Sequence, residues 1–246
     1  MQGGSKVVLI TGAAHRLGAA TARLLHARGC AVVIHYGKSS DKAQALQESL
    51  ERIRPGSVAL AAADLLDPAA PAALIAQAEA AFGRLDGLVN NASSFYPTPV
   101  ATASLADWDD LLGANLRAPF FLVQAAAPAL RQTGGAVVNI VDIHSERPLK
   151  GYPLYSAAKA GLAMLTMSLA RELAPEVRVN GVSPGTILWP ERALTETVKA
   201  EILSRIPQKR IGMPEDIASA VAYLLLDAPY VTGQILAVDG GRSVVI

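Results

Sequence analysis

An α/β fold with one doubly wound parallel sheet of about seven strands, flanked by helices, is predicted from two observations. Short runs rich in β-branched residues alternate with longer Ala- and Leu-rich segments along all 246 residues. Strict alternation of strand and helix is typical of a parallel sheet. The short runs do not switch between polar and apolar residues, which indicates strands that helices cover on both faces.

The predicted elements follow this alternation along the chain. Strands are predicted at residues 6–11, 31–35, 57–61, 87–89, 136–141, 178–182 and 235–238. Helices are predicted at residues 17–28, 41–52, 68–82, 105–130, 154–173, 191–205 and 214–225. We expect residues 1–246 to form a single domain, because no linker, repeat or low-complexity tract interrupts them.

The least regular stretch, residues 184–210, is rich in Pro, Gly, Thr and charged residues. It follows a predicted strand at the edge where open α/β sheets bind their ligands. We therefore predict that it forms a lid, part loop and part helix, over a substrate. The alternative is a plain surface connection.

Composition excludes several classes of function. The formal net charge of +1 provides no basic surface for nucleic acid, and no run of about 18 apolar residues predicts a membrane span. Cys30 is the only cysteine, and His15, His35 and His144 have no carboxylate at ligand spacing, so no metal is expected. Without a secretory signal at the N-terminus, the expected compartment is the cytoplasm.

A glycine turn joins the first predicted strand to the first predicted helix. Gly12 and Gly18 lie on either side of His15, Arg16 and Leu17. Backbone N–H groups at such a helix N-terminus suit a pyrophosphate, so we expect these five residues to bind a dinucleotide. The Arg16 guanidinium would form charge-assisted hydrogen bonds with the phosphates. The alternative is a solvated arginine.

The end of the second predicted strand favours NADPH over NADH. NAD-selective sites usually place Asp or Glu there, to accept a hydrogen bond from the ribose 2′-hydroxyl. Residues 35–40 contain neither. His35, Tyr36, Lys38 and Ser39 supply cations and hydroxyls instead, and such groups suit a 2′-phosphate.

Tyr155 and Lys159 lie four residues apart in a helix-compatible sequence. This spacing places both side chains on one helix face. An ammonium beside a phenol stabilises the phenolate, so we expect Lys159 to lower the pKa of Tyr155. A tyrosine with a pKa closer to neutrality is a usable general acid.

Five motifs together have the order and spacing found in the short-chain dehydrogenase/reductase family. They are the turn from Thr11 to Gly18, the stretch Asn90-Asn91-Ala92, Asn115, the pair Tyr155 and Lys159, and the dipeptide Pro184-Gly185. The whole chain therefore resembles this family, which implies a Rossmann-type fold and an oxidoreductase that uses a nicotinamide cofactor.

The resemblance implies a role for each matching residue. Tyr155 is expected to donate the proton, Lys159 to bind the nicotinamide ribose, and Asn115 to hold a helix kink and a water of the proton relay. The other implied cofactor contacts are Asp64 and Leu65 at the adenine, and Asn91, Ala92, Ser93, Pro184, Gly185 and Thr186 elsewhere along the dinucleotide.

Asp142 departs from the family pattern. It lies thirteen residues before Tyr155, where the family usually has a serine that donates a hydrogen bond to a substrate carbonyl. An ionised carboxylate only accepts hydrogen bonds, so Asp142 suits a substrate with N–H groups or one that needs a second proton carrier. The alternatives are that Ser145 replaces the missing serine, or that Asp142 is a structural loop carboxylate.

Three departures together resemble the pteridine reductase branch of the family, which includes dihydromonapterin reductases. They are Arg16, Asp142 and the stretch from Ser93 to Pro97; Tyr152 also fits this branch. The resemblance implies that a planar pterin lies between an aromatic ring and the nicotinamide. The implied substrate contacts are Arg16, Ser93, Phe95, Asp142, Tyr155 and, in the lid, Trp189.

Phe95 is the aromatic ring that this resemblance implies for stacking on a pterin. The alternative is that Phe95 is an ordinary core phenylalanine beneath a loop. After Pro184-Gly185 the sequence does not closely follow the protozoan pteridine reductases. The preferred pterin therefore stays open.

The predicted function is NADPH-dependent reduction of pterins: dihydropterin to tetrahydropterin, and as a further option oxidised pterin to dihydropterin. Hydride passes to a ring C=N bond. At a C7=N8 bond, Tyr155 protonates the nitrogen with the help of Asp142 and Lys159. At the C6=N5 bond of a dihydropterin, the proton comes through water near Arg16. One rival is an NADPH-dependent reductase of a 3-oxoacyl or sugar-like ketone, and another is an NADPH sensor without catalysis. The resemblance also implies a homotetramer, a dimer of dimers.

Overall fold

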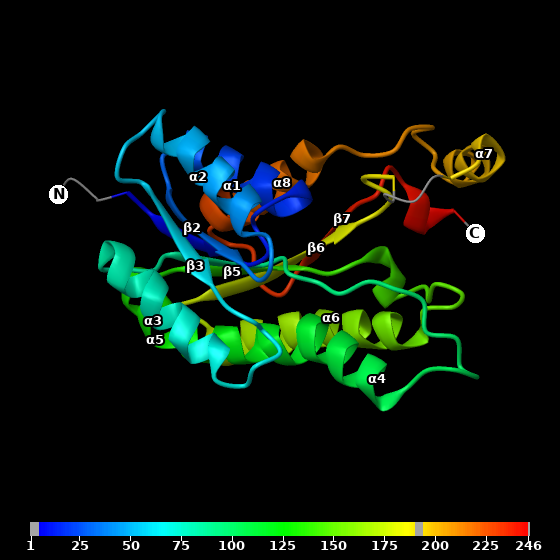
Figure 1. Cartoon of the computed structure of the whole chain (residues 1–246), viewed down its shortest axis with the longest axis horizontal. Coiled ribbons are helices and arrows are strands. Elements are labelled where there is room, and N and C mark those ends of the chain that lie inside the picture. Colours follow the sequence, from blue (N-terminus) through cyan, green and yellow to red (C-terminus); the bar gives the residue numbers. More distant parts are fainter. Residues whose placement is uncertain (1–4, 190–193, 246) are drawn as a thin grey trace.

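Seven parallel strands form one sheet within residues 5–189 and 194–245, which are the residues that the computed structural model describes (Figure 1). The strands are β1 (Val7–Ile10), β2 (Ala31–Tyr36), β3 (Val58–Ala62), β4 (Gly87–Asn90), β5 (Ala136–Ile140), β6 (Arg178–Pro184) and β7 (Ile235–Val238). Their order across the sheet is β3-β2-β1-β4-β5-β6-β7. The predicted α/β fold is confirmed, including the number of strands.

The connections reverse direction between β1 and β4. From β1 the chain runs outward through β2 and β3, and then returns to place β4 on the other side of β1. Leu9 of β1 pairs with Val33 on one side and with Leu88 on the other. The carboxyl ends of β1 and β4 therefore diverge at the position where doubly wound sheets bind their ligands.

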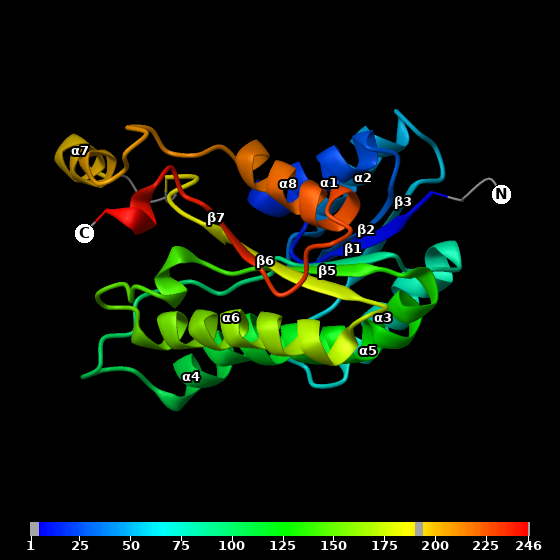
Figure 2. The ribbon, with the colours of Figure 1, turned by 180° about the vertical axis from the view of Figure 1, so that it is seen from behind.

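Helices cover both faces of the sheet, as the two opposite views in Figures 1 and 2 show. One layer contains α1 (Arg16–Ala27), α2 (Ser40–Glu51) and α8 (Pro214–Ala222). The other contains α3 (Ala70–Phe82), α4 (Leu105–Leu112), α5 (Ala118–Thr133) and α6 (Pro153–Leu173). The remaining helix of the described residues, α7 (Glu196–Ser204), projects at one end of the molecule.

Two hydrophobic clusters explain why the strands are apolar throughout. Ile10 and Ile34 belong to the cluster beneath α1 and α8, whereas Leu9 and Leu88 belong to the cluster against α3 and α5. All four side chains are fully buried. Burial of one such side chain stabilises the fold by about 1.5–3 kcal/mol, so both faces of the sheet contribute to the core.

The predicted helix 105–130 is interrupted. It divides into α4 and α5, which a π-helical segment, Gly113–Arg117, joins. The side-chain amide of Asn115 donates to the backbone oxygen of Leu111 over 2.9 Å. In an α-helix that oxygen would accept from the backbone N–H of residue 115, so this contact accounts for the wider turn.

Smaller differences occur at other helix ends. The helix predicted from residue 68 begins at Ala70, because the Asp67 carboxylate accepts from the backbone of Ala69 and forms a turn there. The predicted helix 214–225 ends at Ala222 and continues as a π-helical turn. The helix predicted at 191–205 begins at Glu196; residues 191–193 of that prediction lie outside the described residues.

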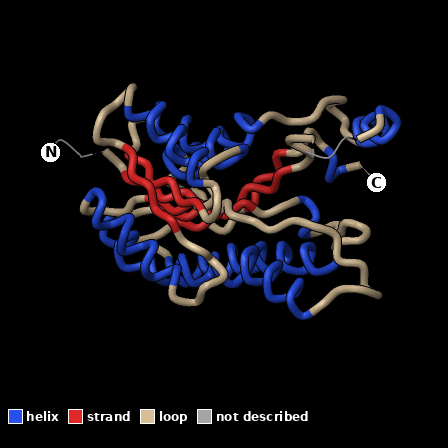
Figure 3. The backbone as a smooth tube through the Cα atoms, viewed as in Figure 1, coloured by secondary structure: helices blue, strands red, loops and turns tan. Residues whose placement is uncertain are grey.

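Long loops follow the strands at the end of the molecule that carries α7, as the tan segments of Figure 3 show. The proposed lid, residues 184–210, includes the end of β6 and all of α7. No side chain of α7 is buried. This helix therefore contributes nothing to the core, which fits both the predicted lid and the alternative of a plain surface connection.

Candidate active site

The turns after β1 and β4 are held together by side-chain hydrogen bonds. Thr11 Oγ1 accepts from the backbone N–H groups of Asn91 and Ala92, over 2.9 and 3.0 Å. The Asn91 amide donates in return to the backbone oxygens of Thr11 and Gly12, over 2.8 and 3.1 Å. These bonds fix the backbone at the point where the sheet reverses direction.

Both glycines of the first turn are required by its geometry. Gly12 has a φ of +60°, a conformation that other residues rarely adopt. A Cβ atom on Gly18 would lie 2.5 Å from the backbone oxygen of Gly12 and 2.7 Å from the Asn91 amide nitrogen. Because Gly12 and Gly18 have no side chains, the start of α1 can lie against the turn. A phosphate site at a helix N-terminus needs this close approach.

Arg16 occupies a strained position in the same turn. Its φ is +53°, in the left-handed region, where an L-residue costs roughly 1–2 kcal/mol. Its side chain is exposed and lines the pocket described below. Glycine is the usual residue for such a conformation, so Arg16 keeps its side chain here at a cost in stability.

A pocket of about 460 Å³ opens beside this turn. Its walls include twelve of the predicted cofactor-binding residues: Gly12, His15, Arg16, Leu17, Gly18, His35, Lys38, Asp64, Leu65, Asn91, Ala92 and Ser93. Lys38 and Arg16 place their positively charged side chains beside the backbone amides of the turn, and this combination fits the phosphates of a dinucleotide.

Some pocket residues were not predicted, and some predicted ones lie elsewhere. Gly37, Ala63, Leu66, Ser94, Asp110 and Ala114 also line the pocket. Of these, only Gly37 lies in a segment, residues 35–40, that the sequence already indicated as part of the cofactor site. Tyr36 packs against the hydrophobic cluster beneath α1, and Ser39 precedes α2 without capping it; neither lines the pocket.

His35 corrects one prediction. Its side chain is only 2% exposed; Nδ1 accepts from the Gly12 N–H, and Nε2 donates to the Ala63 oxygen, each over 3.1 Å. Burial lowers its pKa. His35 is therefore a neutral ring that supports the glycine turn, and the prediction that it helps to bind a 2′-phosphate as a cation is wrong.

Asp142 and Tyr155 form the centre of the site. The Tyr155 hydroxyl donates to Oδ2 of Asp142 over 2.8 Å. The other carboxylate oxygen accepts from the backbone N–H of His144, also over 2.8 Å, at the start of a short 3-10 turn. The phenol therefore has Asp142 as its hydrogen-bond partner, which favours Asp142 over Ser145 as the residue that acts with the tyrosine.

The pKa of Tyr155 shifts in the direction opposite to the prediction. Burial raises it well above the usual value for tyrosine, and the Asp142 carboxylate raises it further. Lys159 does not offset this, because its ammonium donates to the Ile140 backbone oxygen over 2.8 Å and lies 5.7 Å from the centre of the Tyr155 ring. The phenol therefore keeps its proton.

Lys159 is itself perturbed. Only 3% of it is exposed, and burial lowers its pKa from 10.5 to about 8, although the Asp142 charge opposes the shift. The predicted helix-face relationship of Tyr155 and Lys159 is confirmed, since both lie in α6 and face the buried side. At neutral pH the ammonium remains mostly charged.

Asn115 connects the π-helical segment to the loop after β4. Its side-chain oxygen accepts from the Ser93 hydroxyl over 2.6 Å, and its amide donates to the Ser94 backbone oxygen over 2.9 Å. The Ser94 hydroxyl donates in turn to Asp110 over 3.2 Å. Asn115 is completely buried. It therefore positions the loop that contains Phe95.

Phe95 belongs to an aromatic group beside the catalytic pair. Its ring stacks on Tyr152, with centroids 4.7 Å apart and planes 13° from parallel, and meets Tyr155 edge-on at 4.8 Å. Because Phe95 is 55% exposed, the alternative of a core phenylalanine is wrong. The ring is available for an aromatic ligand next to the tyrosine hydroxyl.

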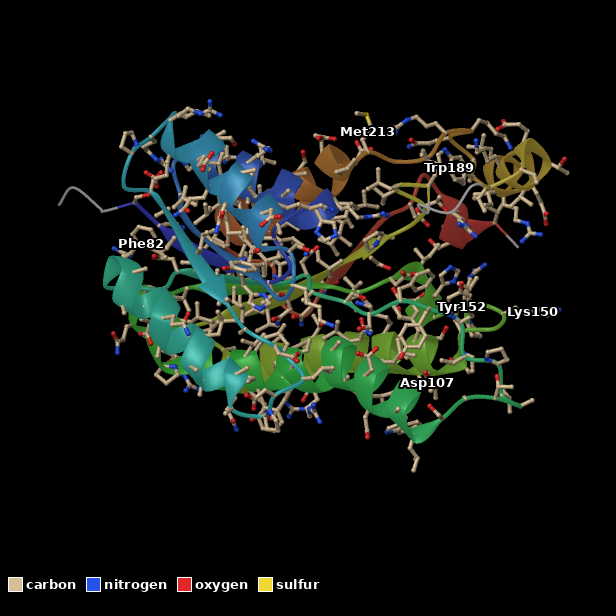
Figure 4. All side chains as sticks on the ribbon, in the orientation of Figure 1. Phe82, Asp107, Lys150, Tyr152, Trp189 and Met213 are labelled. Atoms are coloured by element: carbon tan, nitrogen blue, oxygen red, sulfur yellow. The ribbon has the colours of Figure 1, made fainter. Side chains whose placement is uncertain are left out.

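The predicted lid, residues 184–210, begins at the end of β6. Pro184 ends β6 and is buried, and Thr186 follows it with its backbone oxygen bonded to Gly212. Figure 4 shows Trp189 beside α7, at the end of the molecule where Tyr152 also lies. Trp189 is half-buried. None of these three residues lines the pocket beside the glycine turn.

Within the described part of the chain, no group of three or more His, Cys, Asp or Glu side chains is placed to hold a metal ion. No helix there is long and apolar enough to cross a membrane.

Residues 12–243 match the protein family described as enoyl-(acyl carrier protein) reductase. Pteridine reductase 1 of Leishmania tarentolae is 37% identical over 278 residues, which cover 96% of this chain and 96% of the relative. The chain belongs to the short-chain dehydrogenase/reductase family. A second group of this family is equally similar: the 3-oxoacyl-(acyl-carrier-protein) reductase of Staphylococcus aureus is 37% identical over 241 residues, which cover 96% of this chain and 98% of the relative.

The 3-oxoacyl-(acyl-carrier-protein) reductase of Synechocystis sp. is also 37% identical, over 243 residues that cover 96% of both chains. Overall identity therefore does not separate a pterin substrate from a 3-oxoacyl substrate. As a member of the short-chain family, the chain is an oxidoreductase. The choice of substrate depends on the residues around Tyr155.

Proposed function

We propose that this short-chain reductase uses NADPH to reduce pterins, converting dihydropterin to tetrahydropterin and also accepting oxidised pterin. The observation that supports this most is the 2.8 Å hydrogen bond from Tyr155 to Asp142, beside the exposed Phe95 ring. A carboxylate that accepts and an aromatic ring that stacks suit a flat, nitrogen-rich heterocycle.

The cofactor fits the pocket by its chemistry. Arg16 and Lys38 would bind phosphates, Lys38 in particular the 2′-phosphate, since residues 35–40 contain no carboxylate to favour a free ribose hydroxyl. When bound, NADPH supplies the hydride. The backbone turns after β1 and β4 hold it in place, because their hydrogen bonds leave them little freedom.

Tyr155 and Asp142 hold the proton that the reaction needs. The phenol keeps its proton because burial and the carboxylate raise its pKa. When N8 of an oxidised pterin approaches, the hydroxyl turns from Asp142 Oδ2 and gives it the proton, whereas N5 of a dihydropterin takes its proton from water near Arg16. The buried Lys159 ammonium then stabilises the phenolate until solvent restores the proton.

Pterin recognition would use both faces and edges of the ring. Phe95 stacks on one face, a contribution of about 0.5–1.5 kcal/mol beyond burial. Asp142 accepts from ring N–H groups, and Ser93 and Arg16 reach polar atoms at the edge. Asn115 supports this arrangement, since it bonds the residues immediately before Phe95.

A second candidate is reduction of a 3-oxoacyl or similar ketone with NADPH. The equal identity to the 3-oxoacyl-(acyl-carrier-protein) reductases favours it. Tyr155 and Lys159 serve both reactions. Asp142 argues against it, because an ionised carboxylate cannot donate a hydrogen bond to a ketone oxygen.

One experiment separates the two. The purified chain is mixed with NADPH and with biopterin, dihydrobiopterin or a 3-oxoacyl thioester, and loss of NADPH absorbance is followed. We expect turnover with both pterins, and in Asp142→Ser a loss of about 10²-fold or more with biopterin, whose N8 takes its proton from the Tyr155–Asp142 pair. Full biopterin turnover by Asp142→Ser, or turnover of the ketone alone, would contradict the proposal. Ser145→Ala is the control, since Ser145 does not contact the phenol.

Assembly and compartment remain predictions. A homotetramer is supported by membership of the family, and static light scattering tests it. Fractionation of the cells that make the protein tests the cytoplasmic location.

A further inference from the structure

Both ends of the lid (residues 184–210) contact one turn near the C-terminus, residues 239–243, which we name the C-terminal turn. At the first end, Gly185 lies so close that a Cβ atom on it would be 2.7 Å from Asp239 Cα. At the other end, the backbone N–H of Gln208 donates to the Gly240 oxygen over 3.1 Å. A Cβ on Gly240 would be 2.8 Å from the buried side chain of Ile206.

The C-terminal turn is itself well ordered by one carboxylate. Asp239 Oδ1 accepts from the Gly241 N–H over 2.8 Å, and Oδ2 accepts from the Ser243 N–H over 2.6 Å. Gly240 and Gly241 have φ values of +64° and +85°, which glycine adopts without strain. The turn therefore offers a fixed support to whatever it binds.

Arg242 links this support to the lid through a side-chain bond. Its guanidinium donates to the hydroxyl of Thr186, and the backbone oxygen of Thr186 accepts from Gly212 over 2.9 Å. Arg242 is half-buried between these elements. A guanidinium with several donors in a fixed plane holds a loop more rigidly than a flexible ammonium would.

The same guanidinium lies within the electrostatic influence of the catalytic carboxylate. Burial lowers the pKa of Arg242, the Arg205 charge at the end of α7 adds to this effect, and the charges of Asp142 and Asp239 oppose it. Three charged groups from different parts of the chain thus act on the Arg242 guanidinium. The lid bond of Arg242 and the Asp142 carboxylate therefore lie in one region.

We propose that Arg242 is a positioning residue, which holds the lid in place over the substrate side of the Tyr155–Asp142 pair. It does so through Thr186, at the first end of the lid. Its importance for turnover rests on the proposed reductase function, whereas its effect on the lid does not. Displacement of a lid by about 1 Å is enough to lower a rate by about 10²-fold.

Trp189 provides a direct measurement of the lid. The chain has two tryptophans, and Trp108 is an exposed residue of α4. In a Trp108→Phe background, the quenching of fluorescence by acrylamide therefore reports the exposure of Trp189 alone. Arg242→Gln is compared with the background. Arg210→Gln is the matched control, because Arg210 is exposed and pairs with Asp216, not with Thr186.

We expect Arg242→Gln to increase quenching of Trp189, and Arg210→Gln to leave it unchanged. With the pterin or the ketone, whichever is turned over faster, Arg242→Gln should lower kcat/KM by about tenfold or more, while the Kd of NADPH stays within error. Arg242→Lys should recover only part of the effect. Unchanged quenching in Arg242→Gln would overturn the proposal. Equal losses in kcat/KM and in NADPH affinity would also overturn it, because a general structural role would produce both.

A second route covers the case in which Arg242→Gln fails to fold. Thr186→Val removes only the acceptor of the guanidinium, and should increase quenching in the same way. If Thr186→Val and Arg242→Lys both quench like the background, the proposal fails. If the unaltered protein reduces neither pterin nor ketone, the proposed function fails, but the quenching comparison still decides the role of Arg242.

Discussion

The Tyr155 hydroxyl donates a hydrogen bond to Asp142 over 2.8 Å, and this bond changes how the tyrosine acts. A phenol beside a carboxylate is held in its protonated form. The lysine of the same helix, Lys159, is bonded to the Ile140 oxygen instead. Burial and the Asp142 charge thus keep the tyrosine protonated, and in the proposed reaction Lys159 contributes once the proton has left.

Replacement of the carboxylate should shift the pH dependence of turnover. Burial and the Asp142 charge raise the pKa of Tyr155; an amide in place of the carboxylate removes the second cause. In Asp142→Asn we therefore expect the alkaline limb of the kcat/KM profile to move to lower pH, with a fall in turnover of about 10²-fold.

The profile is measured with NADPH and biopterin over neutral to alkaline pH. Asp109→Asn is the control, since Asp109 is an exposed residue of α4. A limb that stays in place or moves to higher pH would show that Asp142 does not influence the phenol.

Lys159 should make stability depend on pH in the ligand-free protein. Burial lowers its pKa from 10.5 to about 8. Between these values the unfolded chain binds one more proton than the folded one, so the free energy of unfolding rises with pH, by about 1.4 kcal/mol for each pH unit. From about pH 8 to about pH 9.5 the gain is roughly 2 kcal/mol.

Urea unfolding of the unaltered protein and of Lys159→Met at the two pH values measures this gain. The gain should be absent from Lys159→Met and present in Lys150→Met, because Lys150 is an exposed loop residue. An equal gain in both variants would mean that another group titrates.

Much of the fold was predictable because its signals are local. Apolar runs without alternation predicted all seven strands. Five of them, β1, β2, β4, β5 and β6, are buried along almost their whole length, whereas the edge strand β7 is partly exposed. The break in the helix 105–130 had no local signal, and only the family resemblance implied a kink at Asn115, because the π-helical turn depends on its bonds with Leu111, Ser93 and Ser94. Contacts between distant residues leave no periodic pattern in the sequence.

The site shows the same division. The spacing of Tyr155 and Lys159 predicted their shared helix face. The direction of the tyrosine pKa was missed, because it depends on which oxygen each side chain reaches. His35 was predicted at the end of the second strand, and the structure agrees, with β2 continuing to Tyr36. The local sequence did not reveal that its ring is buried against Gly12 and Ala63, which removes it as a phosphate ligand.

Lys38 should determine the preference for NADPH. It lines the pocket where a 2′-phosphate would lie, and an ion pair lost there is expected to cost about 1.4 kcal/mol or more, which is tenfold in affinity. We expect Lys38→Ala to raise the KM of NADPH by about tenfold and to leave that of NADH unchanged. Lys42→Ala is the control, because Lys42 is exposed on α2 and does not line the pocket. Similar effects on both cofactors would place the 2′-phosphate elsewhere.

Arg16 should show a trade of stability for binding. Its φ of +53° strains any residue with a Cβ, so Arg16→Gly should be more stable than Arg16→Ala by about 1 kcal/mol. Both variants lose the guanidinium and should bind NADPH more weakly by a similar factor. Urea unfolding and cofactor titration measure the two effects. The control is the same pair of changes at Arg23, an exposed residue within α1, where glycine should instead be the less stable by about 1 kcal/mol. If alanine were the more stable residue at both positions, the backbone at Arg16 would not be strained.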